Sequence, residues 1–209
     1  MQVHFSDQIS DQISHSKKEN PLGELVAVLM NAVDKKDHVT GLHLRRVVQY
    51  SKMISHQMNL SAFECEQIAL GALLHDVGKI EVLDEILKKP APLSTEERIE
   101  MQKHSEHGFD ILSREAQSTM GMESVISAVR HHHERWDGEG YPSRLKGTEI
   151  PRMARIIAVA DAFDAMVSDR PYRGARSNAY AFQEIVDHRG TQFDPEVVDA
   201  FVAAFQELK

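Results

Sequence analysis

The sequence predicts an all-α protein whose helices form one bundle. The chain has 209 residues, which is enough to bury a substantial core in a single helical domain. Apolar residues recur at helical spacing in several stretches, and no stretch shows strand-like alternation of useful length. Hydrophobic residues make up 42% of the chain and aromatic residues only 6%, a globular composition that favours helices over a β-sandwich.

Local signals mark where the helices begin. Asn20 followed by Pro21, like Asp194 followed by Pro195, is typical of a helix start. The Ser-x-x-Glu patterns that open at residues 61 and 94 predict capping boxes. The KKPAPL stretch before the second pattern is expected to be a loop. We expect helices over residues 20–34, from about residue 40, from residue 61, over residues 94–111, 122–133 and 150–167, and from residue 194.

Composition excludes several classes of function. The formal net charge of −8 and the pI near 5.8 argue against a broad surface for nucleic acid polymers or anionic membranes. No apolar run approaches the length of a membrane span, and the polar start lacks the apolar core of a secretory signal, so we expect a cytoplasmic protein. Cys65 is the only cysteine, so any transition-metal site must use histidines and carboxylates.

Two stretches combine apolar residues with acids that need partners. His75 and Asp76 end the apolar run ALGALL, where a buried carboxylate would need a compensating charge or metal ion. A helix end with a solvated acid and a capping Gly78 explains this pair equally well. Asp161 lies with Asp164 in an otherwise apolar helix, so burial of Asp161 is expected. It could serve there as a metal ligand or only as a hydrogen-bond acceptor.

Histidines supply the other candidate ligands. His132 and His133 follow His131 directly before a loop that Asp-Gly, Gly and Pro force to be tight. Neutral imidazoles are common ligands of Fe, Mn, Zn and Ni, although three consecutive histidines also occur as a surface run. His43 and His104, taken singly, are more typical of exposed or hydrogen-bonded histidines.

Taken together in order, these segments resemble the HD-GYP family of cyclic dinucleotide phosphodiesterases over about residues 37–200. The resemblance rests on Asp37-x-x-Thr40-x-x-His43-x-x-Arg46, LLHDVGKI, His104 with Gly108, HHERWDGEGYP, RIIAVADAFDAM and DRPYR. It implies an HD-domain helical bundle with an HD-GYP C-terminal extension. Residues 1–36 would then be a polar leader and first helix, and residues 37–209 the phosphodiesterase domain.

The resemblance also implies a centre of two divalent metal ions, which we expect to be Fe or Mn because of the His and Asp ligands. The implied ligands of one ion are His43, His75, Asp76 and Asp161. Those of the other are Asp76, His104, His132 and His133. Asp76 would bridge the two ions, which activate water and stabilise the charged transition state. Asp37 is a candidate acceptor for the second ring nitrogen of a ligand histidine.

Further residues are implied in catalysis and substrate binding. Lys79, one helical turn beyond His75, is expected to bring its ammonium onto the substrate phosphate or the bridging hydroxide, although a lysine there is also an ordinary charge at a helix end. Arg170 and Arg173 resemble the phosphate-binding residues of the family. Tyr141 is expected to flank the guanine base or a signalling partner that contacts the GYP loop, which is the loop containing residues 140–142. Trp136 is expected to be a packing residue rather than a base-stacking one.

The implied reaction is hydrolysis of cyclic di-GMP to pGpG, GMP or both. Val39 occupies the position where some family members have a glutamate that holds a third ion, so a two-ion site is expected. Three alternatives stay open: a catalytically weak cyclic di-GMP receptor or partner-binding module, a cyclic GMP-AMP phosphodiesterase, and an HD-fold oxygenase. A homodimer through the first helices is also expected.

Overall fold

The protein is a bundle of helices, as expected from its sequence. The computed structural model describes residues 21–36, 40–116, 119, 121–169 and 174–206. Within these ranges there is no strand, and an isolated bridge joins Arg189 to Phe193. The α-helices are α2 (Pro21–Lys36), α3 (Thr40–Gln57), α4 (Ala62–Leu74), α5 (Asp84–Leu87), α6 (Thr95–Gln102), α7 (His104–Ala116), α8 (Met122–His131), α9 (Arg152–Val167), α10 (Asn178–Asp187) and α11 (Pro195–Gln206). Two short 3-10 helices are η1 (Val77–Glu81) and η2 (Gly147–Glu149).

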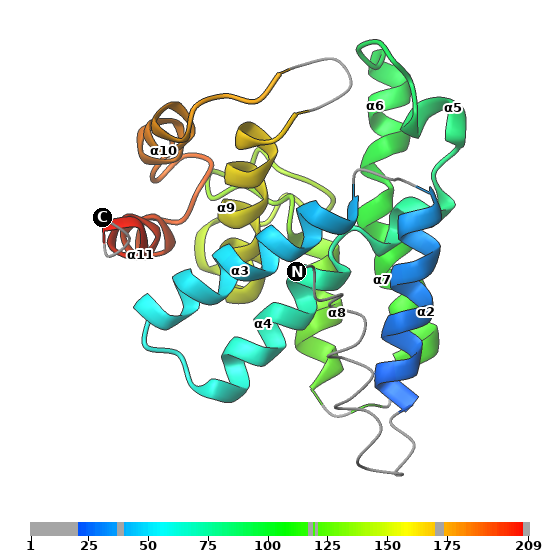
Figure 1. Ribbon diagram of the computed structural model, residues 1–209, viewed down its shortest axis with the longest axis horizontal. Coiled ribbons are helices and arrows are strands. Elements are labelled where there is room, and N and C mark those ends of the chain that lie inside the picture. The colour runs from blue at the N-terminus through cyan, green and yellow to red at the C-terminus, as the bar shows by residue number, and fades with distance from the viewer. Residues whose placement is uncertain (1–20, 37–39, 117–118, 120, 170–173, 207–209) are drawn as a thin grey trace, which may run out of the picture.

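Two hydrophobic clusters hold the helices together. The larger cluster surrounds α9, where α3, α4, α10 and α11 pack around fully buried residues such as Phe163 and Phe201 (Figure 1). The smaller cluster joins α2, η1, α7 and α8 through residues that include Val33 and Leu112. Met153 packs against both clusters, which makes the core continuous. Each fully buried Phe or Leu side chain contributes about 1.5–3 kcal/mol to folding.

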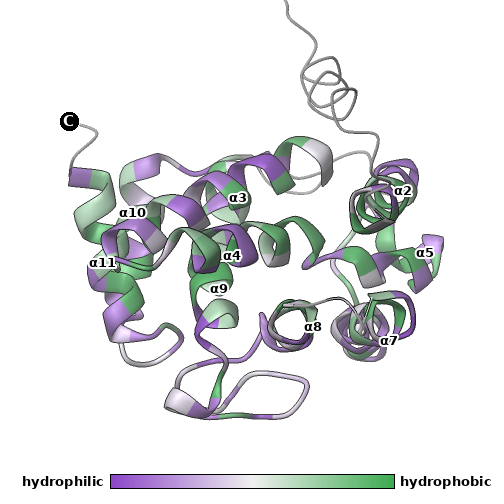
Figure 2. Cartoon of the chain, turned by 90° about the horizontal axis from the view of Figure 1, so that it is seen from below, coloured by the Kyte–Doolittle hydropathy of each residue, from purple (hydrophilic) through white to green (hydrophobic). Residues whose placement is uncertain are grey.

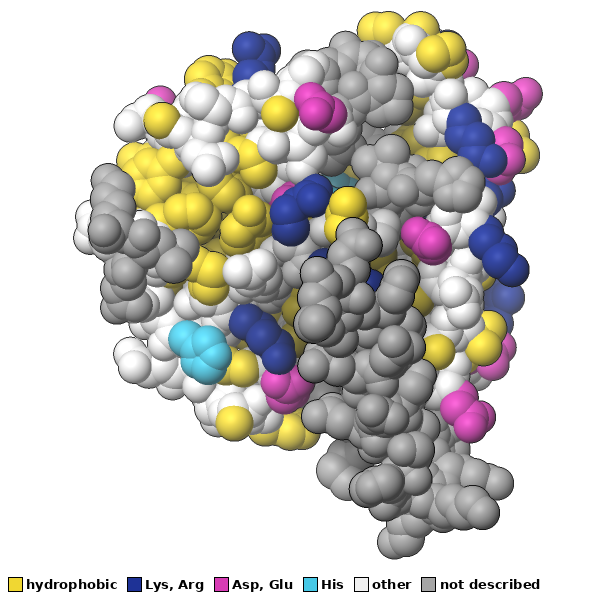
Figure 3. All heavy atoms as spheres, in the orientation of Figure 1, with side chains coloured by type: hydrophobic (Ala, Val, Ile, Leu, Met, Phe, Trp, Pro, Cys, Tyr) yellow, Lys and Arg dark blue, Asp and Glu magenta, His cyan; other side chains and the backbone are white. Residues whose placement is uncertain are grey.

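The distribution of hydropathy follows this arrangement. In Figure 2 the hydrophobic segments of α4 and α9 lie in the middle of the molecule, between the other helices. On the face shown in Figure 3, hydrophobic side chains also gather between α10, α11 and α3. None of the described helices is both long enough and apolar enough to cross a membrane.

Most helix starts are confirmed, and the caps explain why. Ser61 accepts a hydrogen bond from the amide of Glu64, whose carboxylate accepts one from the amide of Ser61, and Ser94 makes the same capping box with Glu97. The predicted helix from residue 150 begins instead at Arg152, because Pro151 disfavours helical geometry at the residue before it. Residues 1–20, which include the predicted leader and its Asn20 cap, lie outside the described residues.

The single helix predicted over residues 94–111 is wrong. The chain forms α6 and then α7, with a break at Lys103, and α7 continues to Ala116. The amide of Lys103 bonds to the carbonyl groups of Glu100 and Met101, which tightens the last turn of α6. The helix predicted over residues 122–133 also ends early, at His131. The helices α5 and α10 were not predicted; α10 begins after Ser177, whose side chain accepts the amide of Tyr180.

The predicted tight loop after α8 is confirmed, and two glycines show why it needs them. Gly138 has φ of +86°, a conformation that side chains other than glycine rarely adopt. A Cβ atom on Gly140 would lie 2.4 Å from the backbone nitrogen of Arg135, so only glycine allows this close approach. The loop therefore folds back onto the end of α8, close to His132 and His133.

Candidate metal centre

The seven predicted ligands come together at one place in the bundle, although they span residues 43–161. Each lies at or near a helix end, except Asp161, which lies within α9. His43 lies in the first turn of α3, and His75 is the C-cap of α4. Asp76 precedes η1, and His104 is the first residue of α7. His132 is the C-cap of α8, and His133 follows it.

One group of side chains gathers around the Nε2 atoms of His43 and His75. The Nε2 atom of His43 lies 3.3 Å from Oδ1 of Asp161 and 4.0 Å from Oδ2 of Asp76. The Nε2 atom of His75 lies 3.4 Å from Oδ2 of Asp76 and 3.9 Å from Oδ1 of Asp161. Two imidazoles and two carboxylate oxygens thus face a common point.

A second group lies on the other side of Asp76. The Nε2 atoms of His104 and His132 are 3.4 Å apart, and a nitrogen of His133 lies within 4.8 Å of both ligand atoms. The Nε2 atom of His104 is 3.6 Å from Oδ1 of Asp76. One oxygen of Asp76 therefore faces each group, which is the geometry that a bridging carboxylate requires.

Hydrogen bonds aim three of the histidine rings. His75, His104 and His132 each bond through Nδ1 to the backbone carbonyl three residues earlier, at 2.7 Å. A carbonyl can only accept, so the proton is on Nδ1 and the Nε2 lone pair is left for the centre. Burial lowers the pKa of His104 and, with nearby histidines, holds the pKa of His132 well below its ordinary value. Both rings are therefore neutral at physiological pH.

This arrangement fits divalent metal ions. The Nε2 atom of His75 is buried and has no hydrogen-bond partner among the described residues. The neutral rings of His104 and His132 point lone pairs at each other across 3.4 Å, which is unfavourable unless a cation lies between them. Neutral imidazole and carboxylate oxygen are the donors that divalent transition metals prefer. When bound, such ions would polarise a phosphodiester and lower the pKa of water.

The two aspartates stay ionised although they are largely enclosed. Burial acts to raise the pKa of Asp76, but Lys79 and the surrounding histidines outweigh it and hold that pKa well below its ordinary value. Lys79 donates from Nζ to Oδ2 of Asp76 at 2.7 Å. Burial of Asp161 is likewise outweighed by His75 and His43, which lower its pKa. The side chain of Asp161 was expected to be buried, but 19% of it is exposed.

Sequence reasoning missed the partner of His43. The ring donates from Nδ1 to Oδ2 of Asp164 at 2.7 Å, and Arg46 holds the same carboxylate. Burial opposes protonation of His43, but Asp164 and the other carboxylates outweigh it and raise the pKa of that ring. Asp37, the predicted acceptor for a ligand histidine, lies outside the described residues. The sequence placed Asp164 three residues beyond Asp161 in the same apolar helix, but it did not show that His43 meets it.

The GYP loop covers the second group. The ring of Tyr141 stacks on His133, with ring centroids 4.8 Å apart, and burial raises the pKa of its phenol. The buried carboxylate of Glu134 accepts the backbone amides of Ser143 and Leu145, which anchors the loop. Glu134 was not singled out from the sequence, where it reads as an ordinary acid after a helix.

Two further residues that the sequence singled out, His131 and Trp136, lie outside the two groups of side chains. His131 bonds through Nδ1 to the carbonyl of Ser127 and contacts the hydroxyl of Ser143 through Nε2, so both of its ring nitrogens are used outside the centre. The guanidinium of Arg155 lies over the ring of Trp136, which supports a packing role for that tryptophan. Arg155 also forms an ion pair with Asp194. Arg170, Arg173 and Val39 lie outside the described residues.

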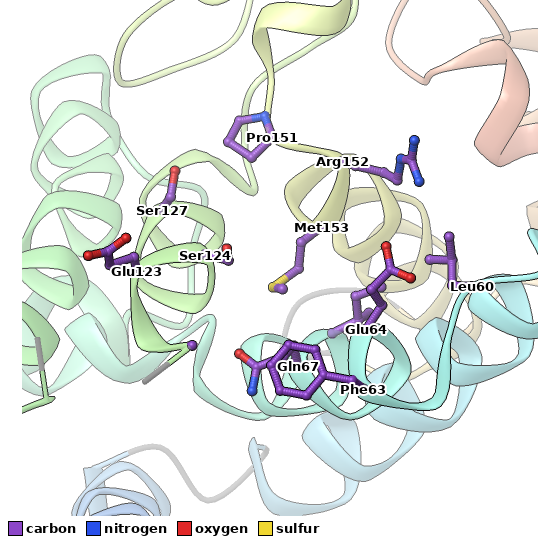
Figure 4. A pocket seen from close by; sticks show the side chains of 12 residues that line it. Leu60, Phe63, Glu64, Gln67, Glu123, Ser124, Ser127, Pro151, Arg152 and Met153 are labelled. Carbon is purple, nitrogen blue, oxygen red and sulfur yellow. The ribbon is translucent and has the colours of Figure 1, made fainter. Parts of the chain in front are cut away.

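A cavity of about 430 Å³ lies apart from the histidines (Figure 4). It is bordered by the first turns of α4, α8 and α9, and Phe63, Gln67 and Met153 line it. The seven predicted ligands do not line it. His75 and His132 lie instead at the opposite ends of α4 and α8.

The chain belongs to the HD domain family, because residues 27–197 match the family's model. It is 42% identical over 190 residues to a cyclic di-GMP phosphodiesterase of Thermotoga maritima, and the aligned region covers 91% of this chain and 51% of that protein. It is 39% identical over 185 residues to the 3'3'-cGAMP-specific phosphodiesterase 2 of Vibrio cholerae, covering 88% of this chain and 35% of that protein. The family resemblance that the motifs predicted is thus confirmed.

Solved structures agree on the fold. A cyclic GMP-AMP phosphodiesterase of V. cholerae superposes with a TM-score of 0.64 at 24% identity, over 88% of this chain and 48% of that chain. This likeness shows the fold alone. The chain spans about half the length, or less, of these relatives.

Proposed function

We propose that this chain is a metal-dependent phosphodiesterase that hydrolyses cyclic di-GMP to pGpG, GMP or both. The observation that carries the proposal is Asp76, whose two oxygens face two separate groups of histidines. Such a bridge is typical of two-ion sites that cleave phosphate esters. The similarity to a cyclic di-GMP phosphodiesterase over 91% of the chain supports the choice of substrate.

The proposed ligands are those that the resemblance implied. His43, His75, Asp76 and Asp161 would hold one ion. Asp76, His104, His132 and His133 would hold the other. Fe or Mn is proposed because five imidazoles and two carboxylates suit these ions, and Val39 offers no ligand for a third.

The chain's own residues would prepare the substrate for attack. Lys79 holds its ammonium 2.7 Å from Asp76, where it can offset charge on a neighbouring phosphate. Tyr141 stays a neutral phenol beside His133 and can donate a hydrogen bond at the edge of the site. We assign Arg170 and Arg173 to the phosphate groups, because they follow α9 directly and a guanidinium binds phosphate in a two-bond fork.

The second candidate substrate is cyclic GMP-AMP. Its support is the 39% identity to a 3'3'-cGAMP-specific phosphodiesterase of V. cholerae. Metal ligands and phosphate contacts do not read the bases, so the described centre serves both dinucleotides equally. A receptor without activity, contacts of the GYP loop with signalling proteins, a homodimer and a cytoplasmic location stay predictions.

The test is to load the protein anaerobically with Fe or Mn and separate the products by chromatography. We expect pGpG or GMP from cyclic di-GMP, and the ratio of rates on the two dinucleotides identifies the preferred one. Binding of cyclic di-GMP without any product would favour the receptor and contradict the enzyme.

Asp76→Ala tests the bridging assignment. It should abolish turnover and lower the metal content, whereas the matched variant Asp199→Ala, at an exposed ion pair with Arg189, should change neither. Hydrolysis with normal metal loading in Asp76→Ala would contradict the bridge. Arg170→Ala should raise KM or lower kcat with the metal content intact, and Arg189→Ala is its control.

A further inference from the structure

We infer that Asp164 is a positioning residue that fixes the ring of His43, and that Arg46 in turn fixes Asp164. The inference rests on the proposed function, in which His43 is a ligand of the first ion. The carboxylate of Asp164 has no exposed surface, yet it lies on α9 one helical turn beyond Asp161. A fully buried charge needs partners on every side.

Those partners are present. Arg46 donates from Nε to Oδ1 of Asp164 at 2.5 Å and from a terminal nitrogen to Oδ2 at 3.1 Å, which is a two-bond fork. The hydroxyl of Ser168 donates to Oδ2 at 3.2 Å and accepts a bond from Arg46 at 2.7 Å. His43 completes the network at 2.7 Å. Such a satisfied buried network allows its members few other positions.

His43 needs this arrangement because of where it stands in its helix. His75, His104 and His132 each follow a helical turn and bond to a carbonyl of that turn. His43 lies in the first turn of α3, where the carbonyl groups accept the hydrogen bonds of the helix itself, whereas the carbonyl groups of a last turn have no intrahelical partner. Its acceptor is therefore a side chain of another helix, α9.

The ring of His43 consequently spans two aspartates of α9. Its Nδ1 atom contacts Asp164 at 2.7 Å, and its Nε2 atom lies 3.3 Å from Asp161. The two carboxylates are three residues apart on one helix, so their spacing sets the position of the ring between them. A carboxylate acceptor also makes the other ring nitrogen a stronger donor to a metal ion than a carbonyl acceptor does.

The chain offers a matched control for this fork. Arg189 makes the same two bonds to Asp199, both at 2.8 Å, on the surface. The side chain of Asp199 is 61% exposed, and its partner in this fork is Arg189 rather than a histidine. Asp199→Asn therefore makes the same chemical change to an Arg fork away from the centre.

The experiment is a titration of metal-free protein with Mn under anaerobic conditions, with circular dichroism to check folding. Wild type should bind two ions. Asp164→Asn should keep one ion at wild-type affinity and bind the other about 10- to 100-fold more weakly. Arg46→Lys keeps the positive charge and loses the fork, so it should weaken the same ion by a smaller factor. Asp199→Asn should bind both ions as wild type does.

The outcomes separate this inference from the proposed function. Unchanged affinities for both ions in folded Asp164→Asn would overturn the positioning role alone. If Asp164→Asn does not fold, Arg46→Lys decides in its place, and wild-type affinities in that variant would overturn the role. Wild type that binds fewer than two ions would overturn both proposals. Two bound ions without hydrolysis of either dinucleotide would overturn only the proposed function, and the affinities would still decide the role of Asp164.

Discussion

Gly78, two residues after Asp76, packs directly against the backbone of α7. A Cβ atom on Gly78 would lie 1.9 Å from the carbonyl oxygen of His104 and 2.4 Å from the amide nitrogen of Gly108. Ordinary contact begins near 3.4 Å, so Gly78→Ala would require α7 to move away by about 1.5 Å. Both obstructing atoms belong to the backbone, so no side-chain rotation can relieve the clash.

The expected cost is large for a single methyl group. Overpacking at a rigid contact costs about 3 kcal/mol, which for a chain of this size lowers Tm by about 6–12 °C. The same movement would carry His104 away from Asp76, from which it is now 3.6 Å distant. A misplacement of about 1 Å in a catalytic centre can cost about 100-fold in rate. We therefore expect kcat/KM to fall about 100-fold at temperatures where the variant is folded.

Thermal unfolding of the metal-free protein measures the first effect, and hydrolysis of cyclic di-GMP after metal loading measures the second. Gly174→Ala is the matched control, because the nearest atom of the described residues to its added Cβ is 3.9 Å away, in Asp169. This control should unfold within a few degrees of wild type. A Gly78→Ala protein with wild-type Tm and wild-type kcat/KM would refute the reasoning.

Three further perturbations address other parts of the structure. Tyr141→Ala should weaken binding of one ion about 10-fold, because it removes the ring stacked on His133. Tyr141→Phe keeps the ring and should bind the ion as wild type does. A calorimetric titration with Mn in which the two variants bound the ion alike would contradict this. Arg155→Met leaves Asp194 buried without its cation and should lower the free energy of unfolding by about 3 kcal/mol, with metal content unchanged; an unchanged urea midpoint would count against it. Burial opposes ionisation of Asp164, but His43 and Arg46 outweigh burial and lower the pKa of Asp164 below the ordinary 3.8. The stability that the ionised carboxylate adds is therefore complete above pH 3.8 and is lost as the pH falls through the lowered pKa. Urea midpoints of metal-free Asp164→Asn should fall less steeply below pH 4 than those of wild type.

The ligand candidates could be named from the sequence because the motifs, taken together in order, resemble the HD-GYP family, although His43 and His104 taken singly do not stand out. His75 and Asp76 are adjacent, and His132 and His133 are adjacent, so two pairs needed no knowledge of the fold. How the pairs meet did need it, because α4 and α8 bring them together from positions more than 50 residues apart. Their role as ligands stays a prediction, but their convergence is a property of the structure.

The sequence could not distinguish the aspartate of α9 that faces the candidate metal centre, Asp161, from the aspartate that holds the ring of His43, Asp164. Asp161 and Asp164 are three residues apart in the same apolar helix, and periodicity treats them alike. The difference arises from the neighbouring helix α3, where His43 and Arg46 meet Asp164. A contact between helices that are more than 100 residues apart leaves no trace in local spacing.

Helix breaks set by side-chain contacts were also beyond local patterns. Residues 94–111 contain no Gly before Gly108 and no Pro, so one helix was the natural expectation. The break at Lys103 coincides with the bond from His104 back to the carbonyl of Met101. Helix α6 has no buried residue, so no apolar stripe marked it as separate from α7.

The proposed ligands lie on or beside α3, α4, α7, α8 and α9, and this distribution would link metal supply to the lifetime of the protein. Ions that bind this centre bind the folded chain and not a chain in which these helices are apart. At a free concentration 100 times Kd, one such ion adds about 2.7 kcal/mol to the free energy of unfolding. The fraction of unfolded molecules then falls about 100-fold, and with it the exposure to proteases. In a cell short of metal, the protein would therefore lose abundance as well as activity.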